Sequence, residues 1–513
     1  MGEHISLIVM IFYFLVLLLI GYLAYRKTND FSDYILGGRK LGPVVGGIAT
    51  GANDMSSWLL LGLPGAVYVS GMSGSWLAIG LCIGAYINWQ FVGKRLRVYT
   101  QVSKNSLTLP DFLENRFEDK DRVLRMISSL FILVFFAFYI SSGLVGGAIL
   151  FESIFDIPYL TALIIGSIII CAYTFIGGFF AVAWTDFLQG TLMFIALLIV
   201  PVVAIATMGG WNSTMDAVGS IDFGHLDIFS GTTSLGIISL LAWGLGYFGQ
   251  PHVIVRFMSM KSTKDITIGT TIYTTWNFLA LLGAIFTGFV GIAYFNSNPL
   301  ENSETVFIAF AQNLFNPWIS GFLLVAVLSA IMSTISSQLL VSATAISEDF
   351  YKGFIRKNAS QKELLIVVRL SVLVVSIFAI FLALNPESSV LGLVGYAWAG
   401  FGSVFGPVIL LALFWKGTTK NGAMAGMLIG GLTVIFWSIL STPPEGMEQS
   451  AAIIPFELYE LVPGFFLSLI ATFAFSKVGR KPSKEMLEEF EMMKKYIGPK
   501  PVDREKEDLK VGI

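Results

Sequence analysis

Charged side chains are scarce in this sequence. Asp, Glu, Lys and Arg make up 13% of its 513 residues, whereas a soluble domain usually carries about 25%. Hydrophobic residues make up 55% of the chain, and its mean hydropathy is +0.76. This balance argues against a string of soluble domains and indicates a single membrane-embedded bundle.

Cysteine and histidine are also rare. The two cysteines, Cys82 and Cys171, lie in apolar runs of different predicted helices, so we expect buried thiols and no disulfide framework. The three histidines, His4, His225 and His252, are too scattered to suggest a metal site.

The usual sequence signatures of catalysis are missing. There is no Gly-x-x-x-x-Gly-Lys phosphate loop, no His-Glu-x-x-His pair and no serine-nucleophile elbow. The sequence therefore gives no motif that would indicate ATP-driven pumping or hydrolysis, and we expect that the protein is not an enzyme. The charged tail is too short to form a kinase-type sensor module.

Long apolar runs dominate what is present. A helix needs about 20 residues to cross a bilayer, and the run from Ile5 to Tyr25 already has that length. We expect this first helix to be retained, because no small-residue cleavage site follows it. The sequence predicts about thirteen transmembrane helices, at residues 5–25, 43–70, 74–98, 124–150, 158–178, 185–208, 232–256, 267–295, 316–347, 363–385, 389–415, 420–440 and 455–476.

The loops between these helices alternate in charge. One set, together with the helix ends next to it, carries nearly all the Lys and Arg, and we count Arg256 with it. Farther inside the predicted helices we expect only Arg369. The other set carries neither Lys nor Arg. Because basic loops stay in the cytoplasm, we predict an external N-terminus and a cytoplasmic C-terminus.

The predicted domain organisation is simple. Residues 1–476 form one transmembrane domain, and residues 477–513 form a charged cytoplasmic tail. In the tail we expect a helix over Ser483–Tyr496 and disorder beyond it. Residues 106–121 are expected to form a short helix on the cytoplasmic surface.

The second predicted helix is interrupted by small and polar residues. From Gly46 to Trp58 it reads GGIATGANDMSSW, which places Asn53 and Asp54 at mid-membrane. An ionisable residue there is costly, so it indicates a functional site. The alternative is a carboxylate that is paired internally for structural reasons.

The seventh predicted helix holds three glycines and a proline. From Leu240 to His252 it reads LLAWGLGYFGQPH. These residues weaken a helix, and unwound backbone is tolerated at membrane depth only inside protein or against a cavity. Close helix packing through small residues is the alternative, although the flanking aromatic residues favour a pocket.

The two interrupted helices stand five apart in order. Paired broken helices in corresponding positions indicate an inverted-repeat transporter. We therefore predict two five-helix repeats, at about residues 43–208 and 232–415, with one extra helix before them and two after. Half-helix N-termini are suited to a substrate carboxylate, and freed carbonyls to a cation.

The ninth predicted helix carries hydroxyl groups on one face. Ser333 and Thr334 follow Ala330 by three and four residues, and such residues share a helix face. The Ala330 carbonyl and the two hydroxyls can converge, and oxygen ligands suit a small hard cation. The alternative is that the hydroxyls bond back to their own helix; the presence of Asp54 favours the cation site.

Several separate motifs resemble one known family. They are spread over most of the chain and include Gly37-Gly38-Arg39, Ala52-Asn53-Asp54-Met55-Ser56, Trp184-Thr185-Asp186, Gly249-Gln250-Pro251-His252 and Ile331-Met332-Ser333-Thr334. Together they resemble the sodium/solute symporter family, and within it the bacterial branch that transports proline.

This resemblance implies a fold and an activity. The fold is an all-α polytopic membrane protein with thirteen helices and a LeuT-type five-plus-five inverted repeat. The activity is sodium-coupled symport of L-proline into the cell by alternating access at the plasma membrane. Sodium is then a co-transported ion, the lipid bilayer is the surroundings, and no nucleic acid is expected; the oligomeric state stays open, with a monomer as one possibility.

The resemblance also assigns site residues. The sodium ligands carried over are the carbonyls of Ala52, Met55 and Ala330 and the hydroxyls of Ser333 and Thr334, with Asp54 as the sodium-linked carboxylate. The proline pocket carried over comprises Ser56, Trp58, Gly62, Tyr139, Trp243, Tyr247 and Pro251. Its aromatic rings suit the apolar ring and secondary ammonium of proline. Asp186 is a candidate gating carboxylate on the cytoplasmic path, or equally a helix cap.

Three residues depart from the family pattern. Asn53 stands where we expect Ser, Ser57 where we expect Gly, and Ser337 where Cys is often found. None removes a proposed ligand, but Asn53 and Ser57 are close enough to the site to shift its affinity.

Two other functions stay open at this stage. The same fold could carry another solute, such as a sugar, a vitamin, a monocarboxylate or another amino acid. A passive channel is also not excluded by the sequence.

Overall fold

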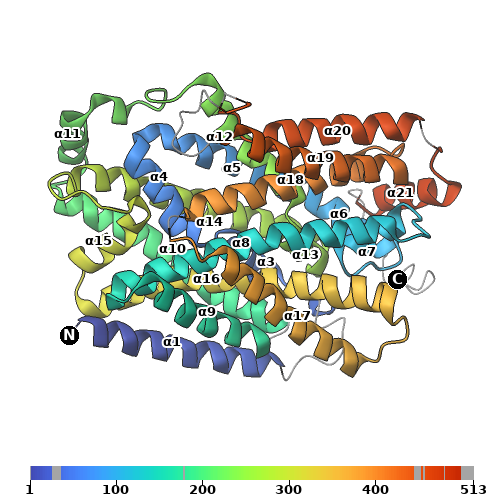
Figure 1. The fold of residues 1–513 in the computed structure, drawn as a ribbon, viewed down its shortest axis with the longest axis horizontal. Coiled ribbons are helices and arrows are strands. Elements are labelled where there is room, and N and C mark those ends of the chain that lie inside the picture. The colour runs from blue at the N-terminus through green and yellow to red at the C-terminus, as the bar shows by residue number, and fades with distance from the viewer. Residues whose placement is uncertain are drawn as a thin grey trace.

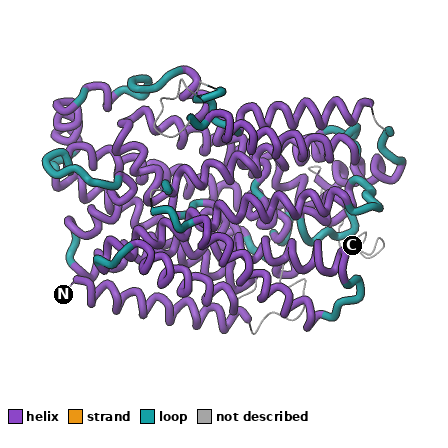
Figure 2. The backbone as a smooth tube through the Cα atoms, in the orientation of Figure 1, coloured by secondary structure: helices purple, strands orange, loops and turns teal. Residues whose placement is uncertain are grey.

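The computed structural model describes residues 2–25, 36–176, 179–386, 388–443, 452–454, 457–478 and 480–497. These residues are helical almost throughout, and no strand occurs among them (Figure 2). The longest helices run side by side along the long axis of the molecule, and most turns lie near its two ends (Figures 1 and 2).

The first predicted repeat and the segments before it occupy the first half of the chain. The elements here are α1 (Gly2–Tyr25), η1 (Gly37–Arg39), α3 (Pro43–Asp54), η2 (Trp58–Gly62), α4 (Leu63–Ser70), η3 (Gly71–Gly74), α5 (Ser75–Ile87), η4 (Asn88–Gly93), α6 (Lys94–Val102), α7 (Leu109–Arg116), α8 (Val123–Phe155), α9 (Tyr159–Ile176), α10 (Phe179–Thr207), α11 (Trp211–Ile221) and η5 (Phe223–Leu226).

The second predicted repeat and the segments after it complete the bundle. The elements here are α12 (Ser234–Gly246), η6 (Tyr247–Gly249), α13 (Pro251–Ser259), α14 (Thr263–Tyr294), η7 (Ser303–Thr305), α15 (Val306–Leu314), α16 (Pro317–Thr344), η8 (Ala345–Ile355), α17 (Gln361–Leu382), α18 (Val390–Phe414), α19 (Lys420–Ser441), α20 (Leu461–Val478) and α21 (Lys484–Ile497).

Ten helical stretches in the described part of the chain are long and apolar enough to cross a membrane. Helical segments occupy all thirteen predicted positions. The count of thirteen transmembrane helices nevertheless stays a prediction. The apolar parts of α9 and of the broken helices are shorter than these ten stretches, and Trp58–Val102 is a single stretch that spans parts of two predicted helices.

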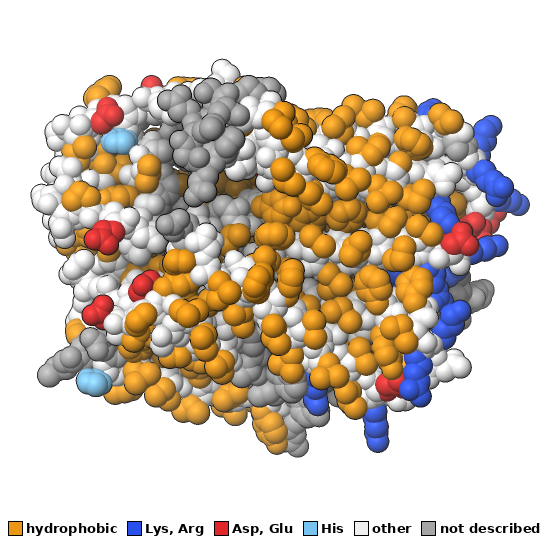
Figure 3. Space-filling view, viewed as in Figure 1, with side chains coloured by type: hydrophobic (Ala, Val, Ile, Leu, Met, Phe, Trp, Pro, Cys, Tyr) orange, Lys and Arg blue, Asp and Glu red, His pale blue; other side chains and the backbone are white. Residues whose placement is uncertain are grey.

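The outer surface of the bundle is apolar over its middle. On α17, Ile377 and Phe381 are both 67% exposed, and Figure 3 shows hydrophobic side chains covering most of the visible face. A soluble monomer rarely exposes so large an apolar surface. The surface of this bundle therefore faces lipid.

Charge separates along the long axis on the face that Figure 3 shows. Lys and Arg side chains gather at the end where α21 and α7 lie, and Asp, Glu and His side chains dot the opposite end (Figures 1 and 3). The alternating charge of the loops in the sequence thus corresponds to two different ends of the folded molecule.

The connecting segments contain helices that the sequence analysis did not predict. Within predicted loops 209–231 and 296–315, the structure forms α11, η5, η7 and α15. The predicted surface helix at 106–121 is shorter, because Thr108 caps α7 by accepting from the Asp111 N–H and the helix ends at Arg116.

The predicted helix in the tail is confirmed as α21, shifted by one residue. It packs against α6, and its apolar residues Met486, Phe490 and Met493 are buried. The predicted disorder after it lies outside the described residues.

Close packing explains part of the glycine pattern in the seventh helix. A Cβ on Gly84 of α5 would lie 2.5 Å from the Cα of Gly244 in α12, so both positions need glycine. The packing interpretation is therefore correct for this first half of the helix. The second half is different, because the helix breaks there.

Candidate functional site

The second predicted helix breaks directly after Asp54. Met55 leaves the helical conformation, with φ −91° and ψ 80°, and the helix resumes at Trp58. The last carbonyls of a helix have no partner within it. Side chains from other helices donate hydrogen bonds to these carbonyls here. The break therefore exposes backbone oxygens that can also bind a ligand.

Two hydroxyl groups of α16 reach these carbonyls. Ser333 Oγ donates to the Ala52 carbonyl at 2.7 Å, and Thr334 Oγ1 donates to the Asn53 carbonyl at 3.0 Å. Ser333 Oγ also lies 3.1 Å from the Ala330 carbonyl of its own helix. The structure thus brings together four of the predicted sodium ligands: Ala52, Ala330, Ser333 and Thr334. Ser333 also bonds back to its own helix, as the alternative interpretation of these hydroxyls proposed.

Asp54 lies beside this cluster and is fully buried. Its Oδ2 accepts from the Tyr247 hydroxyl at 2.7 Å and from the Tyr273 hydroxyl at 2.6 Å. Its Oδ1 has no hydrogen-bond partner among the described residues. A buried carboxylate oxygen without a partner raises the free energy of the folded state, unless a cation or a hydrogen-bond donor binds to it.

The break in the seventh helix faces the break in the second. The helix leaves its regular course at Gln250, with ψ 109°, and α13 begins at Pro251. Gln250 Nε2 donates to the carbonyls of Gly246 and Trp398, at 3.1 and 3.3 Å. The hydrogen bond from Tyr247 to Asp54 joins the two breaks, as the inverted-repeat prediction requires.

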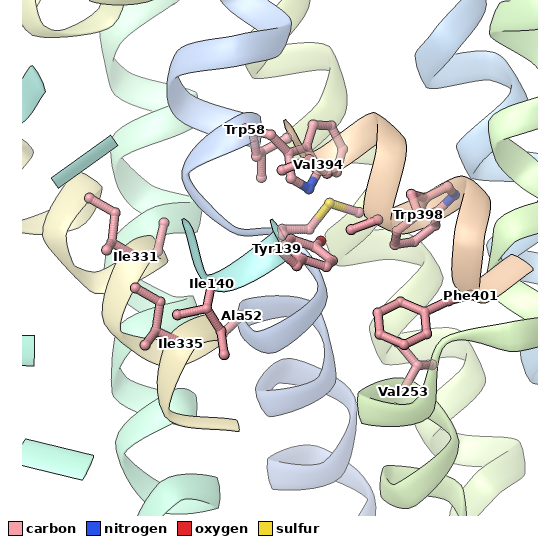
Figure 4. Close-up of a cluster of buried hydrophobic side chains, with 14 of the residues drawn as sticks. Ala52, Trp58, Tyr139, Ile140, Val253, Ile331, Ile335, Val394, Trp398 and Phe401 are labelled. Atoms are coloured by element: carbon pink, nitrogen blue, oxygen red, sulfur yellow. The ribbon is translucent and has the colours of Figure 1, made fainter. Parts of the chain in front are cut away.

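Aromatic side chains surround the two breaks. The ring centroids of Trp58 and Trp243 are 6.4 Å apart, and those of Trp243 and Trp398 are 6.3 Å apart. Tyr139 lies near Trp58, Trp398 and Ala52 in the buried cluster of Figure 4. Its hydroxyl donates to the Asp54 carbonyl at 3.3 Å. Four of the predicted pocket residues, Trp58, Tyr139, Trp243 and Tyr247, therefore line one region.

The other three predicted pocket residues have different surroundings. Ser56 lies in the break itself, where its Oγ accepts from the Trp58 N–H at 3.5 Å. The space beside Gly62 is taken by Leu391 of α18, whose Cβ would lie 3.0 Å from an added Cβ. Pro251 starts α13 on the other side of the break.

An ion pair lies on the side of the site toward α7 and α21. Arg256 Nη2 is 2.5 Å from Asp186 Oδ2, and the two side chains are 2% and 0% exposed. Arg256 Nη2 also donates to Ser337 Oγ at 2.9 Å. The pair joins α13 to α10 and α16, so opening a path between these helices requires it to separate.

Two sequence-based interpretations are wrong here. Arg256 does not belong to a loop, since it is buried in α13. Asp186 is not a helix cap, because α10 begins at Phe179 and Asp186 lies inside it. The buried position is possible for each charge because the other charge meets it.

A cavity lies next to this ion pair. It extends from Asn53 and Arg256 to Thr108 and Asp349, and Pro251 also lines it. Apart from these polar groups its walls are mainly apolar, including Ile132, Phe179, Leu340 and Val341.

Charged residues close the far rim of the cavity. Arg125 of α8 contacts Asp111 and lies 2.7 Å from Glu114 and 3.4 Å from Asp349. Burial raises the pKa of the Glu114 carboxyl above its ordinary value, although Arg125 and Arg122 act in the opposite direction. α7, α8 and η8 are thereby held together at this end of the bundle.

The structure adds three residues that the sequence analysis missed. Tyr273 donates a hydrogen bond to Asp54, and Arg256 pairs with Asp186. Trp398 stacks on Trp243 and meets Tyr247 edge to face. Only Arg256 had a signal in the sequence, since a basic residue near a proline-broken helix invites a search for a buried carboxylate. Nothing in the local sequence marks Tyr273 or Trp398 among the many aromatic residues.

The fold and this site together define a membrane carrier of the inverted-repeat type, with paired broken helices around a buried carboxylate. Residues 34–430 match the profile of the Sodium:solute symporter family. The chain belongs to this family.

Its relatives are similar over nearly their whole length. The chain is 52% identical to the sodium/proline symporter of Escherichia coli K12 over 480 residues, which is 92% of this chain and 93% of that protein. It is 51% identical to the high-affinity proline transporter PutP of Bacillus subtilis 168 over 476 residues, which is 92% of this chain and 98% of that protein.

Among solved structures, a Na⁺-coupled sialic acid symporter in a substrate-bound outward-open state has a similar fold. The TM-score is 0.76 at 20% identity, covering 94% of this chain and 99% of that one. At this identity the likeness concerns the fold alone, and it agrees with the predicted LeuT-type architecture.

Proposed function

We propose that this protein is a sodium-coupled symporter that carries L-proline into the cell by alternating access. The observation that carries the proposal is the cluster at the second-helix break, where Asp54, the Ala52 and Ala330 carbonyls and the hydroxyls of Ser333 and Thr334 meet. Half of the residues are identical to those of relatives named as proline transporters, which supports the choice of solute.

Sodium would bind between α3 and α16. The hydroxyls of Ser333 and Thr334 now donate to backbone carbonyls; around a cation they would turn and offer lone pairs instead. Carbonyls and hydroxyls are hard oxygen ligands, and a site of mostly neutral ligands holds a monovalent ion weakly enough for release. The Met55 carbonyl is the fifth proposed oxygen ligand, and Asp54 supplies the compensating charge.

Proline would bind beside the aromatic residues at the two breaks. Trp58, Tyr139, Trp243 and Tyr247 are suited to enclose an apolar ring and to meet its secondary ammonium. Ser56 and the nearby N-terminus of the resumed helix are suited to the carboxylate. Gly62 and Pro251 would shape the two ends of the pocket, against Leu391 and the cavity respectively.

Access to this site would alternate between two barriers. The Asp186–Arg256 pair is the candidate barrier on the side of the cavity, which gives Asp186 its proposed gating role. On the other side, η7 contacts the beginning of α18 and α4. Opening one barrier while the other stays closed moves the solute across without an open channel.

The gradient supplies the free energy for accumulation. Each sodium charge that moves inward gains about 2.3 kcal/mol per 100 mV of membrane potential, before any concentration term. We further propose a multi-pass transporter domain over residues 1–476 in the plasma membrane, with the N-terminus outside. The tail from residue 477 would lie in the cytoplasm.

Uptake by purified protein in liposomes tests the proposal. An inward sodium gradient should drive accumulation of labelled proline, and excess unlabelled proline should abolish it. Competition by a sugar or a monocarboxylate with none by proline would instead indicate another solute for the same fold. Sodium currents that persist without solute and scale linearly with voltage would indicate a channel and contradict symport.

A further inference from the structure

Asn53 has its backbone in one part of the site and its side chain in another. Its carbonyl accepts from Thr334 Oγ1 at 3.0 Å, within the proposed sodium cluster. Its side chain points to the Asp186–Arg256 pair. With the amide oxygen toward this pair, the oxygen accepts from Arg256 Nε, Arg256 Nη2 and Ser337 Oγ, each at 3.1 Å.

This orientation of the amide follows from its neighbours. A carboxamide nitrogen carries only donors, whereas the groups around this position are a guanidinium and a hydroxyl. Only the oxygen can accept from Arg256, so the hydrogen-bond network determines which atom faces it.

Four helices meet at Arg256 through these contacts. Arg256 lies on α13, and it contacts Asp186 of α10, Ser337 of α16 and Asn53 of α3. Asn53 is the one member of this group whose backbone carbonyl accepts a hydrogen bond from a proposed sodium ligand, Thr334. The contact therefore links the end of α3, where sodium would bind, to the barrier that closes the cavity.

We infer that Asn53 is a positioning residue that makes closure of the Asp186–Arg256 barrier depend on sodium. Sodium bound to the carbonyls at the end of α3 holds that end in one position. The Asn53 amide then stays against Arg256, and Arg256 stays against Asp186. Without sodium the end of α3 is held by the two hydroxyl donors alone, and the barrier separates more readily.

The size of the effect follows from the charge of the partner. A hydrogen bond to a charged group changes an equilibrium by about tenfold or more. Losing the Asn53 contact should therefore lower the ratio of closed to open molecules by a similar factor. Because the apparent affinity falls with the competent fraction, the half-saturating sodium concentration should rise about tenfold.

The inference rests on the proposed function, and its test separates the two. In a chain with Cys82→Ala and Cys171→Ala, the change Val341→Cys places one thiol in the cavity wall. Its labelling rate by a maleimide is measured in inside-out vesicles, with and without sodium and without proline. Sodium should slow labelling of this parent protein.

The informative variants are Asn53→Leu, which keeps the shape, and Asn53→Ala, which truncates the side chain; each removes the amide oxygen and puts no hydrogen-bonding group in its place. In both, labelling should be equally fast with and without sodium, and the half-saturating sodium concentration for proline uptake should rise about tenfold. Ser141→Ala is the matched control, since Ser141 is buried in α8 and its hydroxyl has no partner among the described residues.

Each outcome has a defined meaning. A normal sodium response in both Asn53 variants, or a parent whose labelling ignores sodium, would overturn the inference. A Ser141→Ala variant that loses the response as well would overturn it too, because the loss of any buried polar group in the bundle would then suffice. Sodium-dependent labelling in a parent that takes up no proline would support the inference and contradict the choice of proline.

Discussion

At the scale of single residues, Asp54 is central because its side chain is buried beside the carbonyls of a broken helix. Two tyrosine hydroxyls meet one carboxylate oxygen and leave the other without a partner among the described residues. The alternative interpretation, that the Asp54 carboxylate is paired within the protein, is thus correct for its Oδ2. The second oxygen and the adjacent carbonyls favour the cation.

Replacing Asp54 by Asn should weaken sodium dependence while the protein still inserts. The amide keeps the shape but removes the negative charge, so the half-saturating sodium concentration for proline uptake should rise at least tenfold. Asp216→Asn, on the exposed surface of α11, is the control and should leave it unchanged. Normal sodium activation of Asp54→Asn would remove Asp54 from the site.

The hydroxyls of α16 permit a second test. The double change Ser333→Ala and Thr334→Ala removes two proposed ligands, and at about 1 kcal/mol each the sodium affinity should fall about thirtyfold. Ser336→Ala is the control, because its hydroxyl bonds the Ser333 carbonyl within the same helix. A double variant with normal sodium affinity would move the ion site elsewhere.

At the scale of elements, the helix ends decide the architecture. The start of α18 is capped from a distant segment: Glu304 of η7 accepts from Ser389 Oγ at 3.1 Å and from the N–H groups of Val390 and Leu391 at 3.0 Å. A carboxylate at a helix N-terminus satisfies orphan donors and meets the positive end of the helix dipole. The same segment packs on Gly65 of α4.

Glu304→Ala should therefore loosen this end of the bundle. The buried N–H group of Val390 would lose its partner, at a cost of about 1–3 kcal/mol, and the part-buried N–H of Leu391 would lose its partner too. We expect a lower melting temperature in detergent and faster external labelling of Leu391→Cys. Glu301→Ala, on the exposed part of the same connection, should change neither. Unchanged labelling in Glu304→Ala would show that the cap does not hold α18 in place.

At the scale of the whole molecule, the separation of charge between the two ends predicts one orientation in the membrane (Figure 3). A thiol introduced by His4→Cys should react with an impermeant reagent on intact cells. A thiol introduced by Lys484→Cys, at a side chain that is 92% exposed, should react only after permeabilisation. The opposite pattern would reverse the proposed sidedness.

The sequence by itself determined the membrane class, the helix positions and the two interrupted helices. These features depend on local composition: an apolar run must be long enough to cross lipid, and glycine, proline and a buried charge disturb one helix at a time. The family motifs, which also lie along the linear sequence, supplied the proposed sodium and proline residues.

Only the tertiary structure decided which groups meet at the breaks. Tyr273, Trp398 and Arg256 lie far from Asp54 in sequence, and their roles depend on helix packing that no local pattern encodes. The same holds for Asn53, whose departure from the family pattern gained meaning once Arg256 was found against it. Buried polar groups must find partners wherever the fold provides them, and those partners come from other helices.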